Sequence, residues 1–128
     1  MIAARKAGLA AMVVMLGLAS PAFAASGEMS VATFLAKADA LVAKGFMALA
    51  SSDIGLLKSE GGSAAAAYRA RLDQERGAGH PSSCPPRSAT VGQTQLLSHL
   101  RSYPAAVRAG TTMRTAFADY FIKTYPCR

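Results

Sequence analysis

The chain has 128 residues, of which 52% are hydrophobic and 16% charged, and its net charge is +7 at pH 7. This length suits one domain with a core of modest size. The 14 lysines and arginines are scattered singly, which excludes the basic block typical of nucleic-acid binding and leaves a solubilising surface, or a preference for acidic partners, as the interpretation of the charge.

The first 24 residues have the pattern of a secretory signal peptide. Two basic residues precede an uncharged apolar run over residues 7–19, and Ala22 and Ala24 occupy the small-residue positions of a cleavage site. The run is shorter than the roughly 20 apolar residues of a spanning helix, although an uncleaved anchor is the alternative. We predict cleavage after Ala24, export to the periplasm, and a mature domain of residues 25–128 without a stable membrane anchor, whose charge is two units lower.

The first helix of the mature domain is expected to begin at Ser30, a good N-cap, and to stop at Gly45. A turn over residues 51–53 then caps a brief second helix, and Gly61 and Gly62 are expected to end it. The first helix carries apolar side chains at helical spacing: Val31, Phe34, Leu35, Ala38, Leu41 and Val42.

An alanine-rich helix is expected over residues 63–76. Its apolar stripe is thin, with Tyr68 and Leu72 four residues apart. Oppositely charged residues four apart support this helix, and they are the pairs Arg69–Asp73 and Arg71–Glu75. A loop rich in Gly, Pro and Ser follows, with Cys84 in its middle.

Two further helices complete the chain. One spans residues 94–103 and is broken by Pro104, and the last is capped by Thr111 or Thr112 and ended by Pro126. The last helix has a full apolar stripe on one face, comprising Met113, Ala116, Phe117, Tyr120, Phe121 and Thr124, with Ile122 and Ala118 toward the opposite face. No stretch alternates with period two, so the predicted fold is all-α: a small single-domain bundle of about five helices.

The chain has two cysteines, Cys84 and Cys127. Exported chains meet oxidising conditions, and two cysteines without a third competitor indicate one disulfide. The chain-entropy model gives roughly 4 kcal/mol for closing a loop of this length. We therefore predict that the disulfide clamps the end of the last helix to the loop around Cys84.

No convincing catalytic or metal-binding set is present in the sequence. A nucleophile would need Cys84 or Cys127 beside His80 or His99, but the disulfide accounts better for both thiols. The same four residues lack the ligand spacing usual for zinc. There is no nucleophile elbow, P-loop or dinucleotide fingerprint. We predict a non-catalytic protein without cofactor or metal that has a partner-binding or structural role.

The segment from Cys84 to Cys127 resembles the carboxy-terminal half of the Rap/Tai-type immunity proteins of type VI secretion. The stretches "CPPRSATVGQTQLLSHLRSYP" and "TTMRTAFADYFIKTYPC" carry the likeness. The matching positions are Cys84, Pro86, Thr90, Gln93, Leu97, Leu100, Tyr103, Pro104, Ala116, Phe117, Tyr125, Pro126 and Cys127.

The resemblance implies a small periplasmic helical protein that binds a peptidoglycan-cleaving amidase effector and blocks its active site. Several members of the family work as homodimers, and the disulfide role would fall to Cys84 and Cys127. Family members usually carry a further cysteine pair in the amino-terminal half, where this chain has none. The alternative is therefore a periplasmic helical domain with another binding or structural role and no cognate toxin.

Two surfaces are candidates for contact with a partner. The polar, proline-rich loop over residues 77–89 is one candidate for a protruding element, and the face around Ile122 is a candidate dimer contact.

Overall fold

The computed structural model describes residues 27–128, and the predicted signal peptide and cleavage site lie outside the described residues. Within this range the chain forms helices and no named strand, which confirms the predicted all-α fold. The elements are α1 (Val31–Lys44), η1 (Gly45–Ala50), α2 (Ser52–Gly77), α3 (Gln93–Ser102), η2 (Ala105–Gly110) and α4 (Met113–Thr124), of which η1 and η2 are short 3-10 helices.

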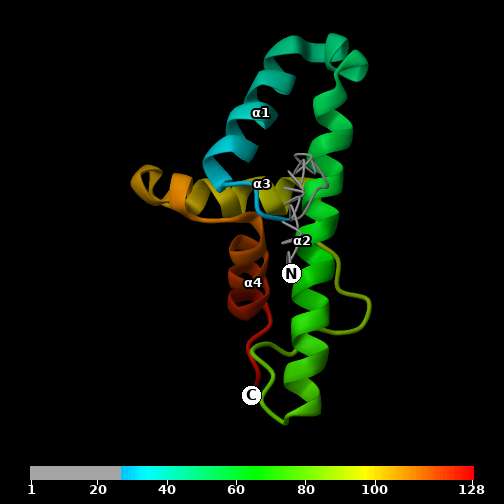
Figure 1. The fold of residues 1–128 in the computed structure, drawn as a ribbon, viewed down its shortest axis with the longest axis vertical. Helices are drawn as coiled ribbons and strands as arrows, with labels where there is room; N and C mark the ends of the chain where they lie inside the picture. The colour runs from blue at the N-terminus through cyan, green and yellow to red at the C-terminus, as the bar shows by residue number, and fades with distance from the viewer. Residues whose placement is uncertain (1–26) are drawn as a thin grey trace, which may run out of the picture.

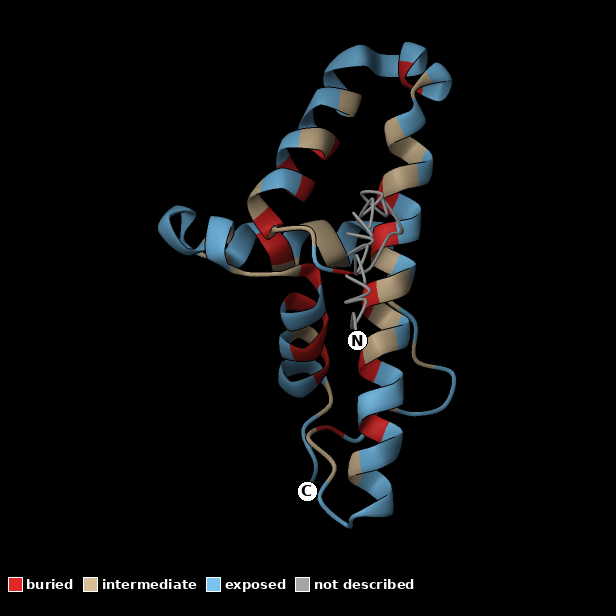
Figure 2. Ribbon diagram, in the orientation of Figure 1, coloured by how far each residue is buried: buried red, intermediate tan, exposed pale blue. Residues whose placement is uncertain are grey.

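Helix α2 forms the long axis of the molecule (Figure 1). Helix α1 lies beside the amino-terminal half of α2, and α4 lies beside its carboxy-terminal half. Helix α3 crosses between the two, and η2 packs against α1. The buried faces of α1, α2 and α4 turn toward one another (Figure 2), so one core runs along the inner side of α2.

The core is built mainly from the stripes that the sequence predicts. The side chains buried in it are Val31, Phe34, Leu35, Ala38, Leu57, Ala64, Tyr68, Leu72, Leu100, Met113, Ala116, Phe117, Ala118 and Phe121. The rings of Tyr68 and Phe121 stack with centroids 5.3 Å apart, which joins α2 to α4. Ala118 was expected on the opposite face of the last helix, but it is only 6% exposed. Helix α4 packs against α3 as well as against α2.

The segment just before α1 is tied into the fold by backbone hydrogen bonds. The amides of Met113 and Arg114 donate to the carbonyls of Met29 and Gly27 at 2.8 and 2.9 Å. Glu60 on α2 is 3% exposed, and its Oε1 accepts from the Met29 amide at 2.7 Å. A buried carboxylate is costly unless it accepts such bonds, so Glu60 fixes this segment against α2.

The predicted break at Gly61 and Gly62 is wrong, because α2 runs without interruption from Ser52 to Gly77. Neither glycine has a positive φ angle, so both take ordinary helical geometry. Buried side chains recur every three or four residues across the predicted break, and they are Leu57, Glu60, Ala64, Tyr68 and Leu72. Packing of this stripe against α1 and α4 outweighs the weak helix propensity of the two glycines.

Of the two predicted ion pairs on this helix, one forms. Arg71 Nε lies 3.0 Å from Glu75 Oε2, whereas Asp73 pairs with Arg76 at 3.6 Å instead of Arg69. The pairing with Arg69 is therefore wrong, and Arg69 has no carboxylate partner among residues 27–128.

Candidate functional site

The predicted disulfide is present. Cys84 and Cys127 are joined by an S–S bond of 2.01 Å, with their Cα atoms 5.0 Å apart. The Cys84 amide also donates to the Tyr125 carbonyl at 2.8 Å. The chain after α4 is thus held to the loop by a covalent bond and by a hydrogen bond.

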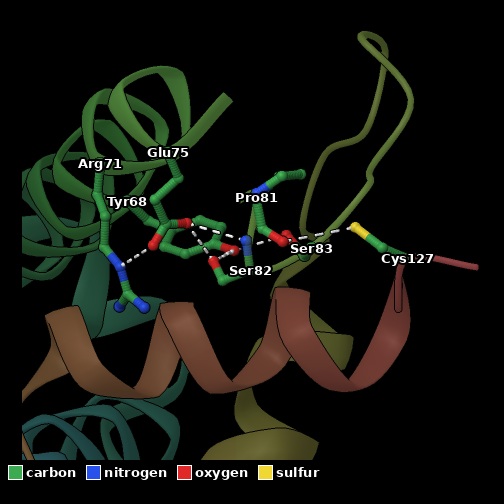
Figure 3. Close-up of polar contacts among 7 residues, drawn as sticks. All are labelled: Tyr68, Arg71, Glu75, Pro81, Ser82, Ser83 and Cys127. Carbon is green, nitrogen blue, oxygen red and sulfur yellow. Dashed lines mark hydrogen bonds and ion pairs between the residues drawn. The ribbon is translucent and has the colours of Figure 1, made fainter. Parts of the chain in front are cut away.

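The loop between α2 and Cys84 is fixed by a polar cluster (Figure 3). Glu75 Oε1 accepts from the amide and the hydroxyl of Ser82 at 3.0 and 2.5 Å. The Tyr68 hydroxyl lies 2.5 Å from Ser83 Oγ. The bond from the Ser82 hydroxyl, then that from its amide, lowers the pKa of Glu75. Glu75 is therefore a charged anchor and a weak base, and the loop is tied down.

His80 is exposed on the loop, and the His99 side chain is hydrogen-bonded to α4. His99 Nε2 lies 2.8 Å from the Ala116 carbonyl oxygen, which can only accept, so this nitrogen is the donor. The Tyr103 hydroxyl donates to Asp119 Oδ2 at 2.5 Å, and burial, followed by this bond, raises the pKa of Tyr103. Both thiols are consumed in the disulfide. Within residues 27–128, no group of three or more potential ligands could hold a metal ion.

The most unusual surface lies where α1 turns into α2. Four large apolar side chains are exposed there within eight residues: Val42 by 75%, Phe46 by 81%, Met47 by 63% and Leu49 by 82%. We call these four residues the apolar tip. Figure 2 shows this connection as mostly exposed, at the end of the molecule away from the core. Single exposed apolar residues are ordinary, but a contiguous group marks a contact surface.

Hydrogen bonds and an ion pair hold the tip in a defined conformation. Gly45 ends α1 with a φ of 59°, and its amide donates to the Val42 carbonyl. The Ser51 hydroxyl accepts from the Asp53 amide at 3.2 Å and caps α2. Lys37 Nζ lies 3.4 Å from Asp53 Oδ1, which links α1 to the start of α2. The exposure of the apolar tip is therefore a property of a structured turn.

Two exposed lysines lie close to the tip in the sequence. Lys44 ends α1 and Lys58 lies in the second turn of α2, and both are exposed. The acidic residues nearest to the tip in the sequence, Asp39 and Asp53, are paired with Arg101 and Lys37. The tip thus presents apolar side chains with lysines close to them in the sequence.

Sequence reasoning missed this surface. Val42 follows the helical stripe of α1 and was expected in the core, which is wrong because α1 extends past the elements that cover it. Phe46 and Leu49 lie four and seven residues after Val42 and so continue its helical spacing, but they follow Gly45, at which α1 ends. Helical spacing alone therefore did not separate these exposed residues from a core stripe.

The two surfaces suggested by the sequence are less favourable. The loop over residues 77–89 is held by Glu75 and by the disulfide, but it carries none of the large exposed apolar side chains among the described residues. Ile122 is 38% exposed, and Ala118, one turn earlier, is buried, so the Ile122 face is a single side chain.

No single helix among the described residues is long and apolar enough to cross a membrane. Only α1 with η1 and α2, taken together as a pair bent by 111°, meet the criterion of length and composition.

Compared with known proteins, the chain matches no family model, and no curated protein and no solved structure is significantly similar to it.

Proposed function

We propose that this chain is an exported, non-catalytic binding protein that inserts the apolar tip into a cleft of a partner protein. The observation that carries the proposal is the exposure of 63–82% of four large apolar side chains on a structured turn. The disulfide between Cys84 and Cys127 is consistent with an oxidising compartment, as the signal-peptide pattern predicts.

The energetics of the tip favour insertion. Burying one such side chain stabilises a complex by about 1.5–3 kcal/mol relative to leaving it in water. A contact of this kind is usually dominated by a few central anchors, among which aromatic side chains are enriched. Phe46, 81% exposed, is the aromatic side chain of the tip. Because α1 and α2 hold the turn in place, little conformational entropy is lost on binding.

The partner is a peptidoglycan-cleaving amidase effector of type VI secretion. This part of the proposal rests on the resemblance of the segment from Cys84 to Cys127 to the Rap/Tai-type immunity proteins. An inhibitor of this kind needs a rigid shape that fills a cleft and requires no chemistry of its own. The alternative is a periplasmic helical domain that uses the same tip on another protein.

Co-expression tests the proposal. A type VI amidase from the same genome, directed to the periplasm, should lyse cells when expressed alone and spare them when this protein is present. If the amidase neither binds the protein nor is neutralised by it, the immunity function fails and the alternative role takes its place.

A further inference from the structure

A groove opens between the carboxy-terminal half of α2 and the loop that follows Cys84. Its volume is about 350 Å³, which lies at the lower end of the range for ligand pockets. Leu72 and Phe121, both buried, line it from α2 and α4, and Pro85 and Pro86 line it from the loop. Because Leu72 and Phe121 are only 3% and 4% exposed, the accessible apolar surface of the groove comes mainly from the two prolines.

Three arginines and one carboxylate, that of Asp73, carry the charge at this groove. Arg69 and Arg76 come from α2 and Arg87 from the loop. Arg76 is paired with Asp73 at 3.6 Å, but neither Arg69 nor Arg87 has an ion-pair partner among residues 27–128. Two uncompensated guanidinium groups beside apolar surface favour an anion that also carries an apolar group.

The wall of the groove is fixed before any ligand binds. Pro85 and Pro86 have restricted backbone angles, and the preceding residue, Cys84, is bonded to Cys127. The Ala89 amide donates to the Pro86 carbonyl at 3.0 Å, which closes a turn that includes Arg87. A wall fixed in this way loses little entropy when a ligand is bound.

We propose that this groove binds a carboxylate that carries an adjacent apolar group, with Arg69 and Arg87 at the carboxylate and with Pro85 and Pro86 against the apolar part. An arginine and a carboxylate form paired, charge-assisted hydrogen bonds. The Tyr68 hydroxyl is occupied by Ser82 and Ser83, so recognition of the charge falls to the arginines. This site lies on a different part of α2 from the apolar tip and does not depend on the proposed function.

A larger hollow elsewhere is a weaker candidate. It has a volume of about 490 Å³, but every residue that lines it, from Thr94 to Ser102, belongs to α3. One face of a single helix encloses no ligand. The groove beside Arg87 is bounded by α2, the loop and α4.

The carboxylate can come from the end of a peptide or from a free organic acid. The probes are therefore N-acetyl-Ala-Phe with a free carboxylate, the same dipeptide as its amide, and 3-phenylpropionate. Each is titrated into the purified protein at up to ~10 mM, and binding is followed by NMR chemical shifts and calorimetry. Tighter binding of the dipeptide acid than of 3-phenylpropionate indicates a peptide terminus, and the reverse order indicates a free acid.

The protein should bind at least one acid about tenfold more tightly than the dipeptide amide. The double variant Arg69→Gln/Arg87→Gln should lose about tenfold or more in affinity for that acid. Lys58→Gln removes a positive charge from α2 outside the groove and should bind as the unsubstituted protein does. The proposal is overturned if neither acid binds, if the amide binds equally well, if the arginine variant is unaffected, or if Lys58→Gln causes the same loss.

Discussion

Gly27 lies so close to Ala64 that a side chain has no room between them. A Cβ atom on Gly27 would lie 3.0 Å from the Ala64 Cα atom and 2.8 Å from the Arg114 Cγ atom, and Gly27 has a φ of 77°. Both the space and the backbone angle therefore require glycine. Gly27→Ala should lower the free energy of unfolding by about 1–3 kcal/mol, as measured by urea denaturation. A change of less than a few tenths of a kcal/mol would show that this packing does not limit stability.

Replacing Gly61 or Gly62 by alanine should have the opposite effect on the free energy of unfolding. A Cβ atom at either position would meet nothing within 4 Å outside the local helix, and both residues have helical backbone angles. Gly61→Ala and Gly62→Ala should each raise the free energy of unfolding by about 0.5–1 kcal/mol, because alanine restricts the unfolded chain. These variants are matched controls for Gly27→Ala in the same titration. A loss of stability would contradict a continuous helix at this point.

The disulfide should account for a large share of the stability. Replacing both Cys84 and Cys127 by serine should lower the free energy of unfolding by about 2–5 kcal/mol. Peptide mapping without reductant should recover the two cysteines in one linked peptide pair. Two thiols that react with an alkylating reagent in protein isolated from the periplasm would contradict the assignment.

Glu75 should contribute to stability in a way that depends on pH. Its hydrogen bonds from Ser82 lower its pKa below the usual value of 4.5. The folded state therefore favours the ionised form, so the contribution is complete above pH 4.5 and is lost as the pH falls through the folded pKa. The difference in unfolding free energy between the unsubstituted protein and Glu75→Gln should shrink between pH 6 and pH 3. A constant difference would contradict the anchoring role of the carboxylate.

Processing of the chain gives a further prediction. The alanines at positions 22 and 24 and the preceding apolar run predict that the exported protein begins at Ala25. Mass spectrometry of protein recovered from the periplasm measures this directly. Recovery of a chain that retains residues 1–24 would contradict export by cleavage.

The sequence predicted much of the fold for a simple physical reason. Apolar side chains recur with helical spacing in α1 and α4, and capping residues such as Ser30 and Thr112 mark where these helices begin. The disulfide followed from having only two cysteines. The interruption expected at Gly61 was wrong, because local propensity weighs less than a buried stripe that continues across it.

The binding surfaces were less accessible to sequence reasoning. The apolar tip is exposed because α1 extends beyond the elements that pack against it, and this depends on the tertiary arrangement. The spacing of Phe46 in the sequence does not distinguish an exposed anchor from a core residue. The groove beside Arg87 is likewise lined by Arg69, which lies 18 positions earlier in the sequence. No local sequence motif predicts that these two residues line the same groove.

Protection against the amidase by variants of the tip tests most directly whether the apolar tip contacts the partner. Phe46→Asp and Leu49→Asp change side chains that are 81% and 82% exposed, so stability should change by less than about 0.5 kcal/mol. Val107→Asp, at a residue that is 44% exposed on η2, is the control outside the tip.

In cells that co-express the periplasmic amidase, survival is measured for each variant at equal protein abundance. The unsubstituted protein and Val107→Asp should protect the cells, whereas Phe46→Asp and Leu49→Asp should not. Full protection by both tip variants would contradict the claim that the apolar tip contacts the partner.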